Sequence, residues 1–310
     1  MAVHTPLSEP EMRDIARIYG LGDLKSMTGL TEGVENTTYR IDTDSGVFIF
    51  SLFEGRGSDA ESADFITRVA HLAAEQGCPV PSPLKTQKGH LWITLRGKPA
   101  FVTPLVPGQT QKAPAPGACK EAARVLAQLH LSLQDSSCFR ANPTGPAYWQ
   151  KLSVHCQGQG MESIDHRCEI EAILGKWPKN LAAGIIHGDY FPNNVFFNAC
   201  DEVTGVIDWG FACTEMLAYD LAMMLNAWGF GKDGTKDPAR FEATLGGYQS
   251  ARELGADERA ALPLLARGAA LRFYLTRLYD ALNHPPAATH APLDPQEYAL
   301  KLQYWREQSL

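Results

Sequence analysis

The sequence lacks several features that would place it in a specialised class of protein. It has no run of five or more basic residues and a net charge of −7, which argues against a protein that binds along nucleic acid. No segment approaches the roughly 20 apolar residues that cross a bilayer, and the N-terminus has no signal-peptide pattern. It also has no internal repeat. We therefore expect neither a nucleic-acid partner nor a membrane partner.

Cysteine is present, but not in a pattern that carries chemistry. The seven cysteines are scattered, odd in number and never arranged as Cys-x-x-Cys. A zinc site or a disulfide framework normally needs such a spacing or an even count. The cysteines therefore predict reduced thiols in a cytoplasmic protein.

What the sequence does contain is enough apolar material for a large core. Hydrophobic residues make up 45% of the 310 residues and charged residues 20%, as in ordinary globular proteins. This length suits one two-lobed enzyme or two domains. It does not indicate an oligomeric state.

The first hundred residues read mainly as strands. Ser8 and Glu11 form a capping-box pattern ahead of a helix that Gly20 ends. Ser58 and Glu61 are expected to open a second helix. The β-type runs are Thr37–Thr43, Val47–Phe53, Leu91–Leu95 and Ala100–Val106. This segment predicts a small antiparallel sheet that carries a helix.

Beyond a Pro/Gly-rich connector at 107–117 the pattern becomes helical. Lys120–Leu133 is amphipathic, and a short β-rich stretch spans 184–211. Further helices are predicted at 217–228, 238–253, 257–283 and 294–308. We therefore predict an α+β fold, with an N-terminal β lobe at residues 1–104 and a larger, mainly helical lobe at 105–310.

The stretch from residue 185 to residue 210 carries the chemistry. Two short β runs, Asn194–Asn198 and Thr204–Asp208, flank a polar turn near Asp201. If they pair as a hairpin, residue 194 lies opposite residue 208, so that the two side chains meet at the open end. Asp189 lies five residues before Asn194. Carboxylate and amide oxygens are the ligands that Mg²⁺ prefers.

This set of side chains suits phosphoryl transfer. One carboxylate, Asp189, would orient the attacking hydroxyl and accept its proton. Asn194 and Asp208 would hold Mg²⁺ against the nucleotide phosphates. Each of the three residues alone is more often a turn former or a strand cap. Their combination favours the catalytic interpretation.

The unit His-Gly-Asp-x-x-x-x-Asn at 187–194, followed by Ile-Asp-Trp-Gly at 207–210, resembles the loops of protein kinases. It resembles those of aminoglycoside and choline kinases more closely. The resemblance implies a two-lobed protein-kinase-like fold that uses ATP and Mg²⁺. It also implies that His187 braces the catalytic loop rather than moving a proton.

The same resemblance implies nucleotide contacts in the N-terminal lobe. Gly33 and Asn36 belong to a segment, LTEGVENTTYRI, that is similar to the phosphate loop of these kinases. Backbone groups from Thr103 to Leu105 are expected to receive the adenine. Ser51 stands where most kinases have a phosphate-binding lysine, and Arg56 is a possible substitute cation.

A narrower resemblance rests on six segments: EGVENTTY, GKPAFVTPLVPG, HGDYFPNNVFF, GVIDWGFAC, LAYDLAMMLNAW and LPLLARGAALRFYLTRLYD. They are similar to bacterial homoserine kinases of the aminoglycoside-phosphotransferase-like type, over about residues 1–305. The resemblance implies phosphorylation of L-homoserine on the route to threonine. Asp208-Trp209-Gly210 replaces the usual Asp-Phe-Tyr, and Glu54-Gly55-Arg56 replaces Glu-Lys-Arg.

These departures keep other substrates and another class of function open. The alternatives are a kinase for an aminoglycoside, choline or methylthioribose, and a pseudokinase, which the serine at position 51 favours. A zwitterionic amino acid needs a cation for its carboxylate. Arg267, Arg272 and Arg277 follow at five-residue steps and do not share one helix face. Arg272 is the predicted substrate contact, and Asp220 is predicted to anchor a helix beneath the site.

Overall fold

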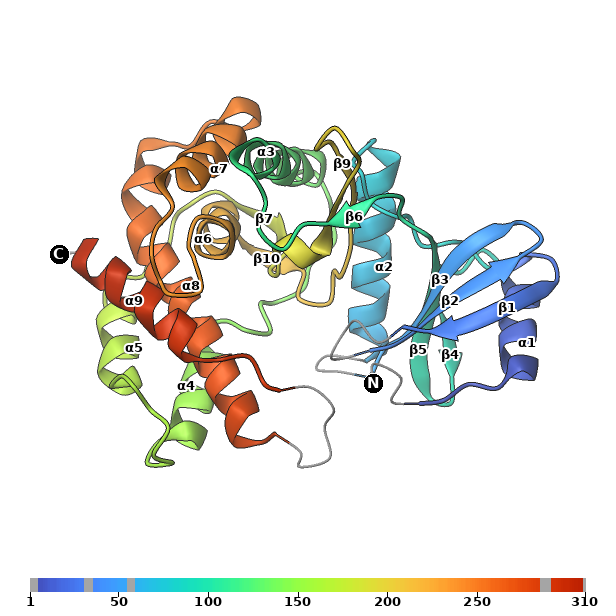
Figure 1. Cartoon of the computed structure of the whole chain (residues 1–310), viewed down its shortest axis with the longest axis horizontal. Coiled ribbons are helices and arrows are strands. Elements are labelled where there is room, and N and C mark those ends of the chain that lie inside the picture. Colours follow the sequence, from blue (N-terminus) through green and yellow to red (C-terminus); the bar gives the residue numbers. More distant parts are fainter. Residues whose placement is uncertain (1–4, 31–35, 55–58, 285–290, 309–310) are drawn as a thin grey trace. The chain divides into compact units, whose positions relative to one another are not determined.

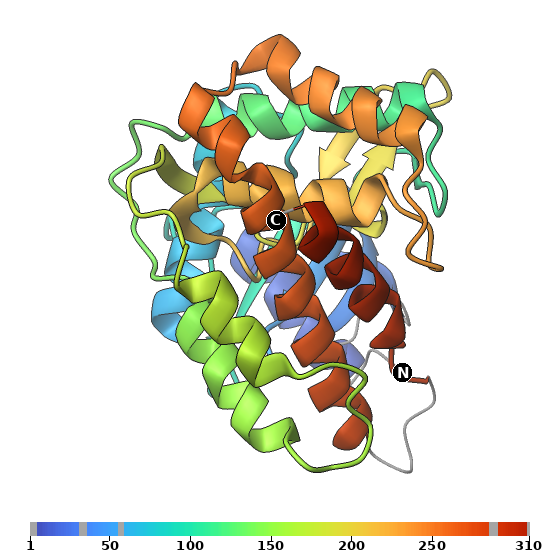
Figure 2. The same cartoon turned by 90° about the vertical axis from the view of Figure 1, so that its left-hand side faces the viewer.

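The computed structural model describes residues 5–30, 36–54, 59–284 and 291–308. The chain divides into two compact units. The first unit comprises residues 1–108 together with 204–210, and the second comprises 109–203 and 211–310. Figures 1 and 2 show the ribbon from two directions.

The first unit is built on a five-stranded antiparallel sheet with strand order β1-β2-β3-β5-β4. Its strands are β1 (Leu24–Gly29), β2 (Thr37–Thr43), β3 (Gly46–Leu52), β4 (Ile93–Leu95) and β5 (Lys98–Pro104). In β2 the side chains alternate between buried and more exposed positions. This period of two shows that one face of the sheet packs on a core.

That core lies between the sheet and helix α1 (Glu9–Tyr19). Met12 and Ile15 of α1 pack in one cluster with Tyr39, Ile41 and Phe50 of the strands. The helix begins at the predicted capping box of Ser8 and Glu11 and ends at Gly20, whose φ is +69°. The two boundary signals in the sequence therefore positioned this helix correctly.

The second helix of this unit, α2 (Ala60–Glu75), begins differently from the prediction. Asp59 is its N-cap, and the Asp59 carboxylate accepts a hydrogen bond from the Ser62 N–H. Ser58, the predicted cap, lies outside the described residues. The capping-box pattern misplaced the start by one residue, because an aspartate is an equally good N-cap.

The second unit is mainly helical. Its helices are α3 (Pro116–Ser132), α4 (Pro146–Cys156), α5 (His166–Leu174), α6 (Leu217–Trp228), α7 (Pro238–Ala251), α8 (Ala256–Leu282) and α9 (Gln296–Gln308). Figure 1 shows α6 surrounded by α3, α7 and α8. Every residue of α6 except Ala227 is buried, so this helix forms the centre of the unit. The predicted α+β class is confirmed.

Short strands hold the loops that carry the chemistry. β7 (Ala183–Ile186) pairs with β10 (Cys213–Met216), and β6 (Gln109–Thr110) pairs with β8 (Val195–Phe197), both antiparallel. β9 (Val203–Val206) follows a turn in which Asp201 has a φ of +58°. The predicted strand start at Asn194 is wrong. Asn194 ends a short 3₁₀ helix (Pro192–Asn194), because Pro192 starts a helical turn there.

Candidate active site

The second residue of the loop from His187 to Asn194 is a glycine that no other residue can replace without strain. Gly188 has a φ of +75°, a left-handed conformation. A Cβ added to Gly188 would lie 2.5 Å from the backbone oxygen of Phe211. The glycine therefore lets the backbone of the loop pass close to Phe211, two residues before β10.

A buried carboxylate fixes the start of the same loop. Asp220 of α6 is fully buried and accepts hydrogen bonds from the backbone N–H groups of His187 (2.8 Å) and Gly188 (3.0 Å). His130 Nε2 lies 3.1 Å from Asp220, and it must donate because a carboxylate only accepts. Asp220 was predicted to anchor a helix, but the group that it anchors is this loop.

The environment of Asp220 keeps the carboxylate charged. Burial raises its pKa, but the hydrogen bond from His130, the charges of His130 and His187 and the backbone bonds outweigh this effect. They hold the pKa of Asp220 below its ordinary value. A charged acceptor forms stronger bonds to backbone N–H groups than a neutral one. The loop is therefore held by charge-assisted hydrogen bonds.

Asp189 and Asn194 are brought together in this unit. Asn194 Nδ2 donates to the Asp189 carboxylate at 3.2 Å and to the Asp189 carbonyl oxygen at 2.9 Å. The Phe191 N–H also donates to that carbonyl, at 2.8 Å. Because both Asp189 partners are acceptors, the amide nitrogen of Asn194 must face Asp189. The amide orients the carboxylate that is predicted to act as the base.

The other end of the Asn194 amide suits a hard cation. Its oxygen accepts one hydrogen bond, at 3.1 Å, from Asn193 Nδ2. An amide oxygen has two lone pairs, so one remains for a metal ion. Asn194 is 3% exposed, and its donor and acceptor ends are fixed by the hydrogen bonds around it. Asn194 is therefore chemically suited to its predicted role.

Asp208 belongs to the first unit. It is exposed and has a φ of +62°, an uncommon backbone conformation for a residue other than glycine. The following residue is fixed, since Trp209 Nε1 donates to the Val206 carbonyl at 3.2 Å. Such strained positions cluster at functional sites. The predicted approach of Asp208 to Asn194 stays a prediction.

The two predicted metal ligands, one amide and one carboxylate, are of the chemical type that binds Mg²⁺ together with phosphates. The described residues contain no group of three or more His, Cys, Asp or Glu side chains that would hold a metal alone. One carboxylate and one amide are what such a site needs, because Mg²⁺ keeps waters and binds phosphate oxygens. The role of Asn194 and Asp208 as metal ligands stays a prediction.

His187 is in contact with the residue that it was predicted to support. Its side chain is buried, and its Nδ1 accepts a hydrogen bond from the Asp189 N–H at 3.3 Å. Its ring packs edge-on against Tyr190, with centroids 5.5 Å apart. These contacts are of the kind that a bracing role requires.

Ser51 lies on the face of the sheet away from α1. It pairs with Thr38 and Phe101 on the neighbouring strands, whereas the adjacent residue Leu52 belongs to the core under α1. Side chains alternate along a strand, so Ser51 and Leu52 point to opposite faces. A cation that replaces the usual lysine would have to reach the face of Ser51.

Lys98 at the start of β5 does not fill that role. Its ammonium group is paired with the Glu54 carboxylate and donates to Thr5 Oγ1 at 3.2 Å. Glu54 also accepts from Thr37, which is buried on the same face of β2 as the core residue Tyr39. Burial raises the pKa of Glu54, but the hydrogen bond from Lys98 and those from Thr37 and Thr5 hold it below its ordinary value. This cluster stabilises the side of the sheet that faces α1.

The remaining nucleotide predictions lie at the two ends of the sheet. Asn36 accepts a hydrogen bond from the Glu54 N–H at 3.2 Å. Thr103 pairs with Ile49 within the sheet, and the Leu105 N–H donates to the Val47 carbonyl at 3.2 Å. Leu105 can therefore offer a ligand its carbonyl rather than its N–H. Gly33 and Arg56 lie outside the described residues.

The three arginines of α8 differ in their partners. Arg267 pairs with Glu169 at 2.5 Å, and Arg277 pairs with Glu297 at 2.8 Å. Arg272 instead donates to the backbone carbonyl of Gly188 at 2.6 Å. The residue predicted to contact the substrate is thus attached to the catalytic loop.

His130 is a residue of the site region that the sequence did not indicate. Its two ring nitrogens bridge Asp220 and Tyr248, whose hydroxyl lies 2.7 Å from Nδ1. A single histidine on an amphipathic helix gives no signal. Its partner Asp220 is 90 residues away in the sequence.

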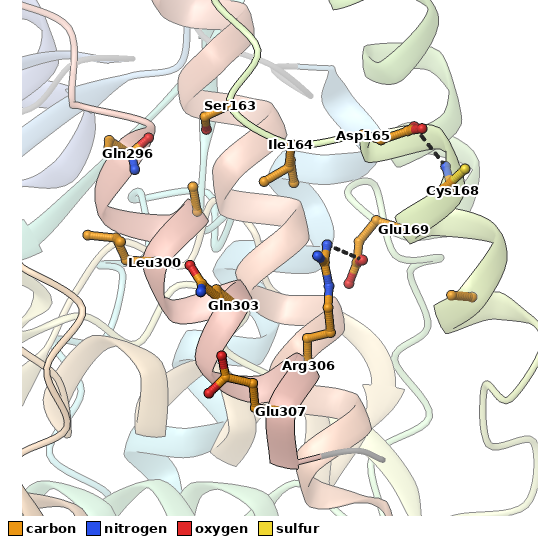
Figure 3. Close-up of a pocket in the computed structure, with 12 residues that line it drawn as sticks. Ser163, Ile164, Asp165, Cys168, Glu169, Gln296, Leu300, Gln303, Arg306 and Glu307 are labelled. Atoms are coloured by element: carbon orange, nitrogen blue, oxygen red, sulfur yellow. Dashed lines mark hydrogen bonds and ion pairs between the residues drawn. The ribbon is translucent and has the colours of Figure 1, made fainter.

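A separate cavity of about 710 Å³ lies between α5 and α9. Figure 3 shows the residues that line it, with Arg306 of α9 donating to Glu169 of α5 at 2.7 Å. None of the residues predicted for the reaction lines this cavity.

In the described part of the chain, no helix is both long and apolar enough to span a membrane.

Comparison with known proteins finds a matching family and full-length relatives. Residues 26–254 match the model of the phosphotransferase enzyme family. The homoserine kinase of Rhodopseudomonas palustris (strain BisB18) is 41% identical over 310 residues, which cover 98% of this chain and 94% of that protein. The homoserine kinase of Paramagnetospirillum magneticum is 40% identical over 316 residues, covering 98% and 96%.

Solved structures share the fold at low sequence identity. An amicoumacin kinase in complex with AMP-PNP and Ca²⁺ has a TM-score of 0.72 and 13% identity, over 98% of this chain and 93% of its own. A spectinomycin phosphotransferase has a TM-score of 0.67 and 16% identity, over 98% and 95%. With the fold of these kinases, the family match and relatives at about 40% identity over nearly its whole length, this chain belongs to the phosphotransferase enzyme family and, within it, to the homoserine kinases.

Proposed function

We propose that this protein transfers the terminal phosphoryl group of ATP to the side-chain hydroxyl of L-homoserine, giving O-phospho-L-homoserine. The observation that carries this proposal is the identity of about 40% to homoserine kinases over almost the full length of both chains. The reaction serves threonine biosynthesis. None of the seven cysteines of the chain forms a disulfide bond, which supports a cytoplasmic location.

Asp189 is the base in the proposed mechanism. The Asn194 amide donates a hydrogen bond that orients the Asp189 carboxylate. Its backbone N–H donates to His187, and the preceding residue Gly188 is bound by Asp220. Asp189 orients the homoserine hydroxyl for in-line attack and takes the proton as the new O–P bond forms. Phosphoryl transfer has a loose transition state, so that a carboxylate of ordinary basicity suffices.

Asn194 and Asp208 are the proposed ligands of Mg²⁺. When bound, the metal ion neutralises charge on the nucleotide phosphates. The amide oxygen of Asn194 and the carboxylate of Asp208 are hard donors of the right type. Gly33, Asn36, Ser51, Thr103 and Leu105 are the proposed nucleotide contacts, with Leu105 acting through its carbonyl.

The test is turnover by the purified protein with ATP and Mg²⁺ on a panel of alcohols. The panel contains L-homoserine, an aminoglycoside, choline and methylthioribose, and phosphorylated product is identified by mass spectrometry. We expect L-homoserine to give the highest kcat/KM, with O-phospho-L-homoserine as the product. A D-homoserine sample controls for recognition of the amino-acid centre.

Other outcomes contradict the proposal in distinct ways. Preferred turnover of another alcohol would keep the kinase mechanism and change the substrate. Nucleotide binding without phosphorylation of any alcohol would instead indicate a pseudokinase, which the serine at position 51 makes a specific alternative.

A further inference from the structure

Arg272 occupies an unusual place for a charged side chain. It is 3% exposed, and its guanidinium carbon lies 4.5 Å from the ring centroid of Phe273 and 5.3 Å from that of Phe211. Nη1 donates to the Gly188 carbonyl at 2.6 Å and also lies 2.9 Å from Met223 Sδ. Nε is buried with no hydrogen-bond partner among the described residues.

Comparison with its neighbours on α8 makes the difference clear. Arg267 and Arg277 are also buried, and each forms an ion pair with a glutamate. Over the described ranges, Arg272 has no such carboxylate partner. Burying a cation without an opposite charge costs free energy. Such residues are rare in proteins, and the contacts of Arg272 therefore point to a function. The only group of the loop that it binds is a backbone carbonyl.

That carbonyl belongs to the peptide that carries Asp189. The C=O of this peptide accepts a hydrogen bond from Arg272, and its N–H, which is that of Asp189, donates to His187 Nδ1 at 3.3 Å. Glycine has the widest backbone freedom of any residue, so the Gly188–Asp189 peptide would rotate more easily if the bond from Arg272 were lost. Rotation of this peptide would move the Asp189 carboxylate away from the attacking hydroxyl.

We propose that Arg272 is a positioning residue for phosphoryl transfer, which acts by holding the Gly188 carbonyl and so the direction of Asp189. The inference rests on the proposed function for the identity of the reaction, but not for the contact itself. It differs from the role predicted from the sequence, in which Arg272 binds the carboxylate of the substrate. The two roles change different kinetic constants.

The experiment compares Arg272→Met with Arg267→Met, a matched loss of a buried arginine. In the control, Glu169 keeps Arg306 as a partner at 2.7 Å. For Arg272→Met we expect kcat to fall by about 10- to 100-fold, because a small misplacement of a catalytic group has effects of this size. KM for homoserine should change less than about threefold, and the control should keep its kcat.

A second measurement does not depend on activity. Hydrogen exchange followed by mass spectrometry should show faster exchange around residues 187–191 in Arg272→Met than in wild type, and no such change in Arg267→Met. Arg272→Lys keeps the charge but lacks the planar donor group, and it replaces the methionine variant if that protein fails to fold. It should show the same effects at a smaller size.

Each result decides one question. A rise in KM for homoserine with unchanged kcat, or unchanged exchange in the loop, would overturn the positioning role. Absence of homoserine turnover by the wild type would overturn the proposed function alone. The split between kcat and KM would then be measured on the alcohol that the wild type phosphorylates.

Discussion

At the scale of single residues, the carboxylate of Asp189 is defined by what surrounds it. The carboxylate accepts a hydrogen bond from Asn194, and the backbone N–H of Asp189 donates to His187. Asparagine at this position would keep the shape and an acceptor oxygen for Asn194, but it cannot accept a proton. Structural and catalytic roles of Asp189 can therefore be separated by one substitution.

We expect Asp189→Asn to lower kcat about 100-fold or more while nucleotide still binds. The measurements are homoserine-dependent ADP release and nucleotide affinity by calorimetry. Asp201→Asn is the matched control, because Asp201 has a φ of +58° that asparagine tolerates and lies in an exposed turn. Equal turnover of the Asp189→Asn and wild-type proteins would remove Asp189 from the mechanism.

The residues of the site differ in how well the sequence indicates them. Asp189 and Asn194 were predicted because they lie five positions apart in one short motif, and the structure places them in contact. His130 gave no local signal, since its role depends on a partner far along the chain. Arg272 was noticed for its charge, but its bond to a backbone carbonyl depends on tertiary packing that no side-chain pattern encodes.

At the scale of elements, α6 supports the catalytic loop through Asp220. This carboxylate has its pKa held below the ordinary value of 3.8, despite burial. Well above pH 3.8 the group is charged in both the folded and the unfolded protein, and its contribution to stability is complete. As the pH falls further, the unfolded chain binds the proton first, so that the contribution is progressively lost.

We therefore expect Asp220→Asn to lower the free energy of unfolding by about 3 to 5 kcal/mol at pH 7, with a smaller difference from wild type below about pH 4. Urea unfolding at several pH values measures both. Asp135→Asn, a change at an exposed position, is the control and should have little effect. A difference that stays constant down to pH 3 would contradict the assigned pKa shift.

Helices with a nearly continuous apolar sequence were predictable, whereas helices without a strong local signal were not. The helix predicted at 217–228 has the same bounds in the structure, because nearly every side chain is apolar and Gly229 follows it. α4 and α5 were not predicted. α4, for example, begins at Pro146 with no side-chain cap. Such elements depend on packing against the longer helix α8.

At the scale of the whole molecule, a ligand that binds only the folded state raises its stability. With Mg²⁺ and AMP-PNP at about 100 times the dissociation constant, the gain is about 2.7 kcal/mol, or a rise in Tm of roughly 4 °C. We expect Asp208→Asn to lose the part of this rise that requires Mg²⁺. Its own Tm should be close to that of the wild type, since asparagine also tolerates a φ of +62°.

Differential scanning fluorimetry with and without EDTA measures this prediction. The wild type in EDTA serves as the reference for nucleotide binding that does not depend on the metal. A full Mg²⁺-dependent rise in Asp208→Asn would show that another group holds the cation, and Asn194→Ala would then be examined in the same way.

The division of the chain has a consequence for its synthesis. Residues 204–210 belong to the first unit, although 109–203 lie between them and the rest of it. The Val206 N–H, for example, donates to the Pro79 carbonyl at 2.8 Å. At a ribosomal rate of about 5 to 20 residues per second, this contact forms on the order of 5 to 20 seconds after residue 108 is added. During this interval the nascent first unit lacks its last segment. A chaperone that binds emerging chains can bind the incomplete unit in this time.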